Sequence, residues 1–122
     1  MAYWLIKTEP SEYSYERLEK EKRTAWGGVS NPVAAKNLRA MAAGDLAVVY
    51  HTGKERRAVG VAEVVAPGDP PTVAAKKRLA TPVGLDVIKA HEAFATSPLV
   101  KMGRLSVVPL TAAQWKVLAG RG

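Results

Sequence analysis

The sequence predicts a small mixed α/β fold in which about four or five strands form a curved or barrel-like sheet with short helices around it. Val-rich segments alternate with short stretches of helical periodicity, so strands and helices both contribute. The connections look too short for the long crossovers of a parallel sheet, which favours antiparallel pairing. A chain of 122 residues has room for one hydrophobic core, and we expect residues 1–122 to form a single domain.

The N-terminal elements are predicted to be a strand and a charged helix. Residues 3–7 form a short buried strand, and a turn at 9–11 follows it. The helix begins at about Ser14, because a serine hydroxyl can accept from the free N–H groups of the first turn.

A second helix is predicted in residues 31–41, with clear signals at its start. Asn31 is a good N-cap residue and Pro32 suits the first helical position, while Gly44 would end the helix after Met41. Its buried face is expected to consist of Ala34, Leu38 and Met41.

A β-hairpin is predicted next, in residues 45–51 and 58–65, two Val-rich segments that bracket a basic turn with Arg56 and Arg57 at its tip. The remaining elements are a strand at 72–79, a helical segment at 84–94, a strand at 106–110, and a last helix that carries Trp115 and Leu118 and opens with a capping box of Thr111 and Gln114.

The charge of the chain favours a polyanionic partner. The net charge is +7, and residues 24–122 hold 13 Lys and Arg against 6 Asp and Glu, so the whole excess lies there. Nucleic acid is the commonest such partner. The alternative is that the charge only keeps the protein soluble.

Several classes of site are disfavoured by composition. There is no Cys and there are two His residues, so we expect neither disulfides nor a metal site. The apolar segment 3–6 lacks the features of a signal peptide, and we expect a cytoplasmic protein without a membrane span.

Catalysis has weak support in the sequence. A catalytic set would need His51 with Ser30, Ser14 or Ser106 and one of Glu9, Asp45 or Glu63. None of these serines sits in a nucleophile elbow, and no phosphate-binding loop, dinucleotide fingerprint or zinc-deaminase signature is present. We therefore expect no enzymatic activity and no cofactor.

Trp26 is the first candidate binding residue, because it precedes two glycines and a helix start. A flat ligand could stack on an exposed Trp26, and the first N–H groups of the helix at Asn31 suit a phosphate or a carbonyl oxygen. The alternative is a Trp that belongs to the core beside glycines that only turn the chain.

Three other short motifs could contact a ligand. The segment "YHTG" (50–53) ends a strand with groups that stack and donate hydrogen bonds, although Thr-Gly is also ordinary turn chemistry. Lys7 and Glu9 share one side of an extended segment, where they could bind a phosphate and a base amino group or simply form an ion pair. Arg104 could reach a phosphate or point to solvent.

Five segments in one order resemble the EVE domain family, formerly DUF55 and similar to thymocyte nuclear protein 1. They are "YWLIKTEP" (3–10), "WGGVSNPVAAKNLRAM" (26–41), "GDLAVVYHTG" (44–53), "AVGVAEVV" (58–65) and "GRLSVVPLTAAQW" (103–115). The resemblance implies a PUA-like pseudo-barrel of about five or six mainly antiparallel strands with surrounding short helices. It also implies a non-catalytic reader of modified bases, chiefly modified cytosine in DNA or a modified base in RNA.

The resemblance implies a base pocket and a basic surface beside it. The pocket residues would be Trp26, Val29, Ser30, Asn31, Tyr50, His51, Thr52, Lys7, Glu9, Arg104 and Ser106. The predicted phosphate contacts are Lys36, Arg39, Lys54, Arg56 and Arg57. Trp26 would be exposed and a flipped base would stack on it, which contributes about 1–3 kcal/mol. The alternatives are a general RNA-binding protein that uses the turn at 54–57 and a small enzyme centred on His51. The sequence leaves the oligomeric state open.

Overall fold

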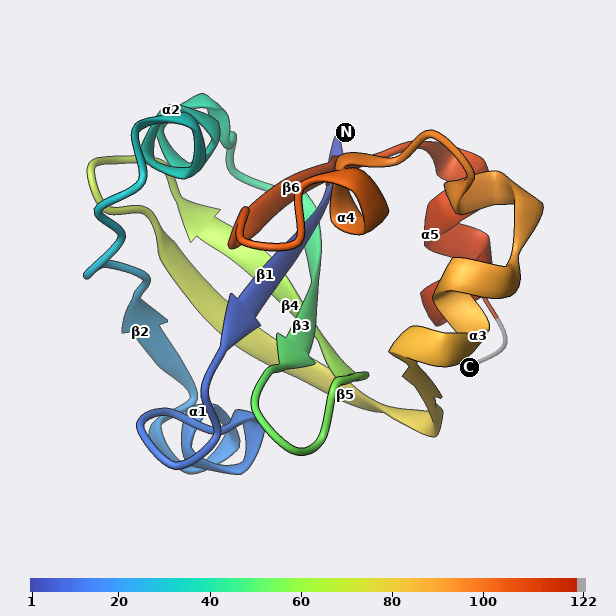
Figure 1. Ribbon diagram of the computed structural model, residues 1–122. Coiled ribbons are helices and arrows are strands. Elements are labelled where there is room, and N and C mark those ends of the chain that lie inside the picture. Colours follow the sequence, from blue (N-terminus) through green and yellow to red (C-terminus); the bar gives the residue numbers. More distant parts are fainter. Residues whose placement is uncertain (121–122) are drawn as a thin grey trace.

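The computed structural model describes residues 1–120 and contains a curled, six-stranded sheet with short helices around it (Figure 1). The strands are β1 (Tyr3–Thr8), β2 (Arg23–Ala25), β3 (Leu46–His51), β4 (Arg57–Ala66), β5 (Thr72–Gly84) and β6 (Val107–Leu110). The helices are α1 (Tyr15–Glu21), α2 (Pro32–Ala40), α3 (Leu85–Ala90), α4 (Pro98–Lys101) and α5 (Ala112–Ala119), with a 3-10 turn η1 (Glu92–Phe94) before α4.

The strand order is β2-β5-β4-β3-β1-β6, which leaves β2 and β6 at the two edges of the curled sheet. All neighbouring strands are antiparallel except β1 and β3, which pair in parallel with Leu5 opposite Val48. The prediction that every connection is too short for a parallel pair is wrong for these two strands. The chain between them contains α1, β2 and α2, which is ample for a crossover.

The predicted helix starts are confirmed. The Ser14 hydroxyl accepts from Arg17 N–H at 3.1 Å, and the Asn31 side chain accepts from Val33 and Ala34. The capping box of the last helix is present as well. Each cap places a side-chain oxygen on an N–H group that the first helical turn leaves without a partner.

Other element boundaries differ from the prediction. The helix α2 ends at Ala40 with Met41 as its C-cap, and Gly44 lies in the following turn with φ of 92°, so Gly44 does not terminate the helix. Arg57 pairs with His51 at the base of the hairpin rather than at its tip. The strand β2 and the helix α4 were not predicted, because three or four residues carry no periodicity.

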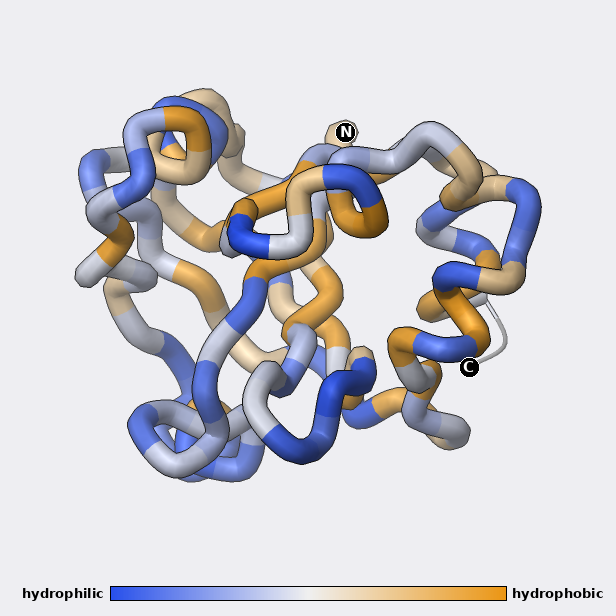
Figure 2. The backbone as a smooth tube through the Cα atoms, viewed as in Figure 1, coloured by the Kyte–Doolittle hydropathy of each residue, from blue (hydrophilic) through white to orange (hydrophobic). Residues whose placement is uncertain are grey.

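The core is made chiefly by β1, β3 and β4, in which consecutive residues are buried, so both faces of these strands are covered. Figure 2 shows hydrophobic residues along these central strands and hydrophilic residues in the turn between β3 and β4. The ring of Tyr15 from α1 packs directly on Gly60, where a methyl group would clash with the ring, and its hydroxyl donates to Val61 O at 2.7 Å. Gly60 therefore makes room for α1 to close one end of the sheet.

Asp45 connects three segments just before β3. Its carboxylate, which is 4% exposed, accepts hydrogen bonds from Ala2 N–H at 3.0 Å, Trp4 Nε1–H at 3.1 Å and Ala42 N–H at 3.0 Å. This single side chain holds β1, the end of α2 and the start of β3 together. Within residues 1–120, the helices are all too short or too polar to span a bilayer.

Candidate functional site

A cavity of about 570 Å³ lies where the curled sheet remains open. Its walls come from the end of β1, the end of β2 with the following loop 26–31, and the segment that leads into β6. These walls belong to opposite sides of the opening, because β2 is one edge strand and β6 is the other. The cavity is within the range of about 300–1,000 Å³ that is typical of small-ligand sites.

The structure brings most of the predicted base-pocket residues to this cavity. Those that line it are Lys7, Glu9, Trp26, Val29, Ser30, Asn31, Arg104 and Ser106. Segments that are far apart in the sequence meet here, and Lys7 N–H donates to Ser106 O at 2.9 Å to hold two of them together.

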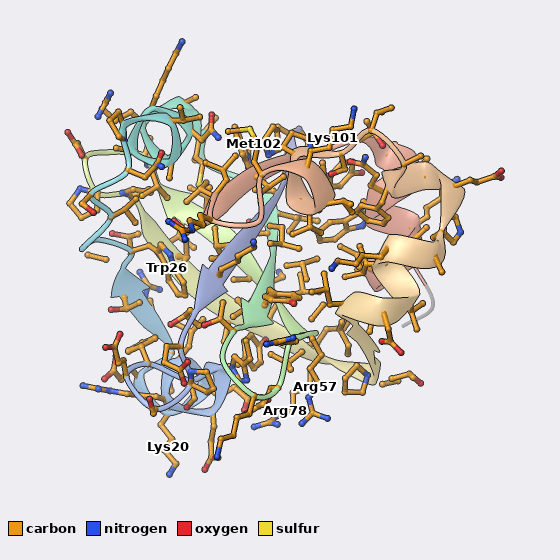
Figure 3. The ribbon with its side chains drawn as sticks, viewed as in Figure 1. Lys20, Trp26, Arg57, Arg78, Lys101 and Met102 are labelled. Carbon is orange, nitrogen blue, oxygen red and sulfur yellow. The ribbon has the colours of Figure 1, made fainter. Side chains whose placement is uncertain are left out.

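Trp26 is a wall residue and not an exposed platform. Its side chain is 7% exposed and belongs to the hydrophobic core, between β2 and β1 (Figure 3). The ring of Tyr13 meets it edge to face, with 5.9 Å between centroids and 89° between planes. The expectation that Trp26 is exposed is therefore wrong, because the indole packs between β2 and β1 and only a small part of it reaches the cavity.

The two glycines after Trp26 shape the loop that carries Val29 and Ser30. Gly28 has φ of 74°, a conformation that residues with a side chain rarely adopt. The N–H groups at the start of α2 are not free for a ligand, since Asn31 Oδ1 already accepts from Val33 and Ala34. The expectation that this helix start binds a phosphate is therefore not supported.

The charged side chains of the cavity include both signs. Lys7 Nζ donates to Gly103 O at 2.9 Å, and burial lowers the pKa of Lys7. Arg104 is exposed at the rim. Opposite them, Glu9 Oε1 accepts from Ser11 N–H and Oγ–H, while Glu12 is exposed at the cavity wall.

The strand end Tyr50, His51 and Thr52 does not line this cavity, so the prediction of one shared pocket is wrong for these three residues. Tyr50 and Thr52 line a second cavity of about 220 Å³, and His51 lines a third of about 360 Å³. The bulge in the β3–β4 pairing between Val49 and Tyr50 shifts the register at this strand end.

His51 has a structural role that uses both ring nitrogens. Nε2 accepts from Tyr15 N–H at 3.0 Å, and Nδ1 lies 2.9 Å from Glu55 Oε1, which lowers the pKa of Glu55. These contacts require the tautomer that carries its proton on Nδ1. The carboxylate partner of His51 is Glu55 and not Glu9, Asp45 or Glu63, which the sequence offered as candidates. Because Nε2 already accepts from Tyr15 N–H, it is not free to take a proton from a serine.

The predicted phosphate contacts are all exposed, on two separate surfaces. Lys36 and Arg39 are on α2, whereas Lys54, Arg56 and Arg57 are on or beside the β3–β4 turn. Arg57 is 3.3 Å from Glu55, and Figure 3 shows it near Arg78.

The family of the chain follows from its match over two segments. Residues 2–77 and 69–121 match the family description "EVE domain". The chain belongs to the EVE domain family. No curated protein sequence matches the chain.

Solved structures resemble this EVE domain along its whole length. The NMR structure of a Rhodopseudomonas palustris protein is 37% identical, with a TM-score of 0.91 and coverage of 100% of this chain and 93% of that chain. The human THYN1 protein, solved in complex with DNA containing 5-methylcytosine, is 26% identical, with a TM-score of 0.79 and coverage of 96% and 95%.

A more distant structure shares only the fold of this EVE domain. ASCH from Zymomonas mobilis is 14% identical, with a TM-score of 0.59 and coverage of 93% of this chain and 91% of that chain. Together these neighbours confirm the expected PUA-like, mixed α/β fold.

Several residues that line the main cavity of this EVE domain were not predicted from the sequence. They include Thr8, Glu12, Tyr13 and Thr24. Tyr13 is the most informative, because its partly exposed ring supports Trp26 and its hydroxyl donates to Glu21 at 2.7 Å. Its only sequence signal is an aromatic residue in the otherwise polar segment before α1, which by itself does not indicate a cavity.

Proposed function

We propose that this EVE domain is a single non-catalytic module that binds nucleic acid and recognises a modified base, most directly a modified cytosine in DNA or a modified base in RNA. The observation that carries the proposal is the cavity of about 570 Å³ at the open side of the sheet, with aromatic, apolar and charged walls. The related human THYN1 protein, in complex with DNA containing 5-methylcytosine, supports nucleic acid as the partner.

The chemistry of the cavity walls suits cytosine. Carboxylates accept hydrogen bonds from the exocyclic amino group of cytosine, and Glu9 and Glu12 supply two of them. Val29, which is partly buried, offers an apolar contact of the kind that binds a base methyl group. Because the indole of Trp26 is almost covered, the base meets Tyr13 and Val29 more than the indole face.

The first experiment is fluorescence-anisotropy binding of short single- and double-stranded oligonucleotides. They carry cytosine, 5-methylcytosine, 5-hydroxymethylcytosine or N6-methyladenine. We expect one modification to bind several-fold more tightly than its unmodified counterpart, and Val29→Asp to abolish this preference by placing a charge in the cavity.

The matched control is Val33→Asp, which introduces the same charge at an exposed position of α2 outside the cavity. It should keep the preference and show the same salt dependence as Val29→Asp. Equal binding of all oligonucleotides by the wild type would contradict recognition of a modified base, and equal behaviour of the two variants would remove the cavity from the explanation.

Charge reversal at Lys54, Arg56 and Arg57 separates a base reader from a protein that binds only the backbone. A reader should lose overall affinity, with a shallower salt dependence, yet retain its preference for the modified base. A backbone binder should lose nearly all binding. The control reverses three exposed charges elsewhere, at Lys20, Lys22 and Lys77, so that net charge falls equally.

A further inference from the structure

A second cavity, of about 220 Å³, shares a wall with the first one and differs from it in charge. Within residues 1–120, three cationic side chains line it, Lys7, Arg56 and Lys89, and no carboxylate does. Lys7 lines both cavities, and Gly103 of the second cavity is followed directly by Arg104 of the first. The two cavities are therefore adjacent, and neighbouring groups of one ligand can occupy both of them.

Among the residues that the structure describes, the cations of the second cavity have no acidic partner. Within residues 1–120, no carboxylate forms an ion pair with Lys7, Arg56 or Lys89. The carboxylate of Glu9 packs against Gly53, which lines the second cavity, but Glu9 itself lines the first cavity. Among the described residues, Glu9 and Glu12 line the first cavity, and the charged side chains that line the second cavity are all cationic.

The backbone holds Arg56 and Lys89 in one unit. Arg56 has φ of 47°, and its Nε donates to Gly53 O at 3.2 Å. Its carbonyl oxygen accepts from Leu85 N–H at 2.8 Å, which fastens the β3–β4 turn to the start of α3. Lys89 is in the last turn of that same helix. A non-glycine residue with positive φ costs free energy that the surrounding contacts must offset, and such residues cluster at binding sites.

Hydroxyl groups and an apolar floor complete the second cavity. Tyr50 is 3% exposed, and burial raises its pKa against the opposing charge of Arg56, so its hydroxyl keeps the proton that it can donate. Thr52 adds a second hydroxyl at the rim. Leu85, Leu99 and Val100 supply apolar surface, which suits the carbon face of a sugar.

We propose that the second cavity binds a backbone phosphate, the phosphodiester adjacent to the base that occupies the first cavity. Cations with hydroxyl donors and no carboxylate are the chemistry of a phosphate site. The assignment rests on the proposed function, because it places the phosphate next to a bound base. It also gives a role to Tyr50 and Thr52, which line the second cavity and not the first.

Oligonucleotides with a single uncharged methylphosphonate linkage, on either side of the modified base, test the proposal. In the wild type, one of the two substitutions should weaken binding roughly tenfold, the loss expected for one charge-assisted hydrogen bond. Lys89→Gln should weaken binding of the unsubstituted oligonucleotide by a similar factor. In this variant, a methylphosphonate at that linkage should cause no further loss of affinity. Lys20→Gln, an equal charge change on α1, should keep the full tenfold response.

A titration with inorganic phosphate, monitored by the NMR amide resonances, tests the phosphate site independently of the proposed function. We expect the resonances of Thr52, Gly53 and Gly103 to shift and that of Thr24 to stay unchanged, with the shifts lost in Lys89→Gln. If phosphate shifts them but no oligonucleotide binds, the site stands and the proposed function fails. If a modified base is preferred while neither linkage nor Lys89→Gln has an effect, the phosphate site is overturned.

Discussion

Trp26→Ala is expected to lower the free energy of unfolding by about 3–5 kcal/mol, the cost of truncating a buried aromatic residue to Ala. Trp26 is 7% exposed, and its indole fills the space between the β2 edge and β1. Removal of the indole also leaves the ring of Tyr13 without its edge-to-face neighbour. Urea denaturation at neutral pH measures the change, with Val33→Ala as an exposed control that should stay within about 0.5 kcal/mol of the wild type.

A loss of stability this large makes Trp26→Ala a poor test of base binding. Loss of binding by Trp26→Ala would report a disturbed wall of the cavity as readily as a lost contact with a base. Trp26→Phe keeps an aromatic ring in the space and should cost clearly less. A loss below about 1 kcal/mol for Trp26→Ala would show that the indole is not the packed residue described above.

Asp45→Ala is expected to lower the free energy of unfolding by about 2–4 kcal/mol, because buried N–H groups lose their acceptor. The Trp4 Nε1–H group is buried, and the N–H groups of Ala2 and Ala42 are partly buried. Burial alone would raise the pKa of Asp45, but the hydrogen bonds from Ala42, Ala2 and Trp4 together lower it.

The sign of this pKa shift fixes the pH dependence. A carboxyl group with a lowered pKa in the folded state stabilises the fold above its unfolded pKa, about 3.9, and this contribution is lost as the pH falls through the folded value. The difference between wild type and Asp45→Asn should therefore be constant from pH 7 to 5 and shrink below about pH 4. Asp86→Asn, at an exposed carboxyl group, should show a difference below about 1 kcal/mol throughout. A difference that grows on acidification would contradict the assignment.

Local signals in the sequence were sufficient for much of the fold. Ser14, Asn31 and the pair of Thr111 and Gln114 mark helix starts through contacts of two or three residues, and the structure confirms each of them. The parallel pair β1 and β3 was not predicted, because its partners are separated by two helices and a strand that pairs elsewhere. Pairing of this kind depends on the packing of the whole chain and leaves no local pattern.

The candidate site, like the fold, was predicted only in part from the sequence. The residues that share a cavity were named largely through resemblance, and the structure places eight of them together. Two mistakes have the same physical origin. Trp26 was expected to be exposed and His51 was placed with the base, yet each is covered by residues near α1, Tyr13 and Tyr15, that the sequence did not connect to them.

The pairing of β1 with both β3 and β6 sets the order in which the binding site can form. Tyr3 pairs with Leu110, so the first strand of the chain completes its hydrogen bonding only with the last strand. Contacts this far apart in sequence slow folding, because a long loop must close before they form. A chain in which residues 104–110 are not yet in place therefore lacks both the Lys7–Ser106 contact and the wall of the cavity that carries Arg104. Ligand binding by this domain therefore requires that β6 has already paired with β1, and chains that lack this pairing should not compete for its ligand.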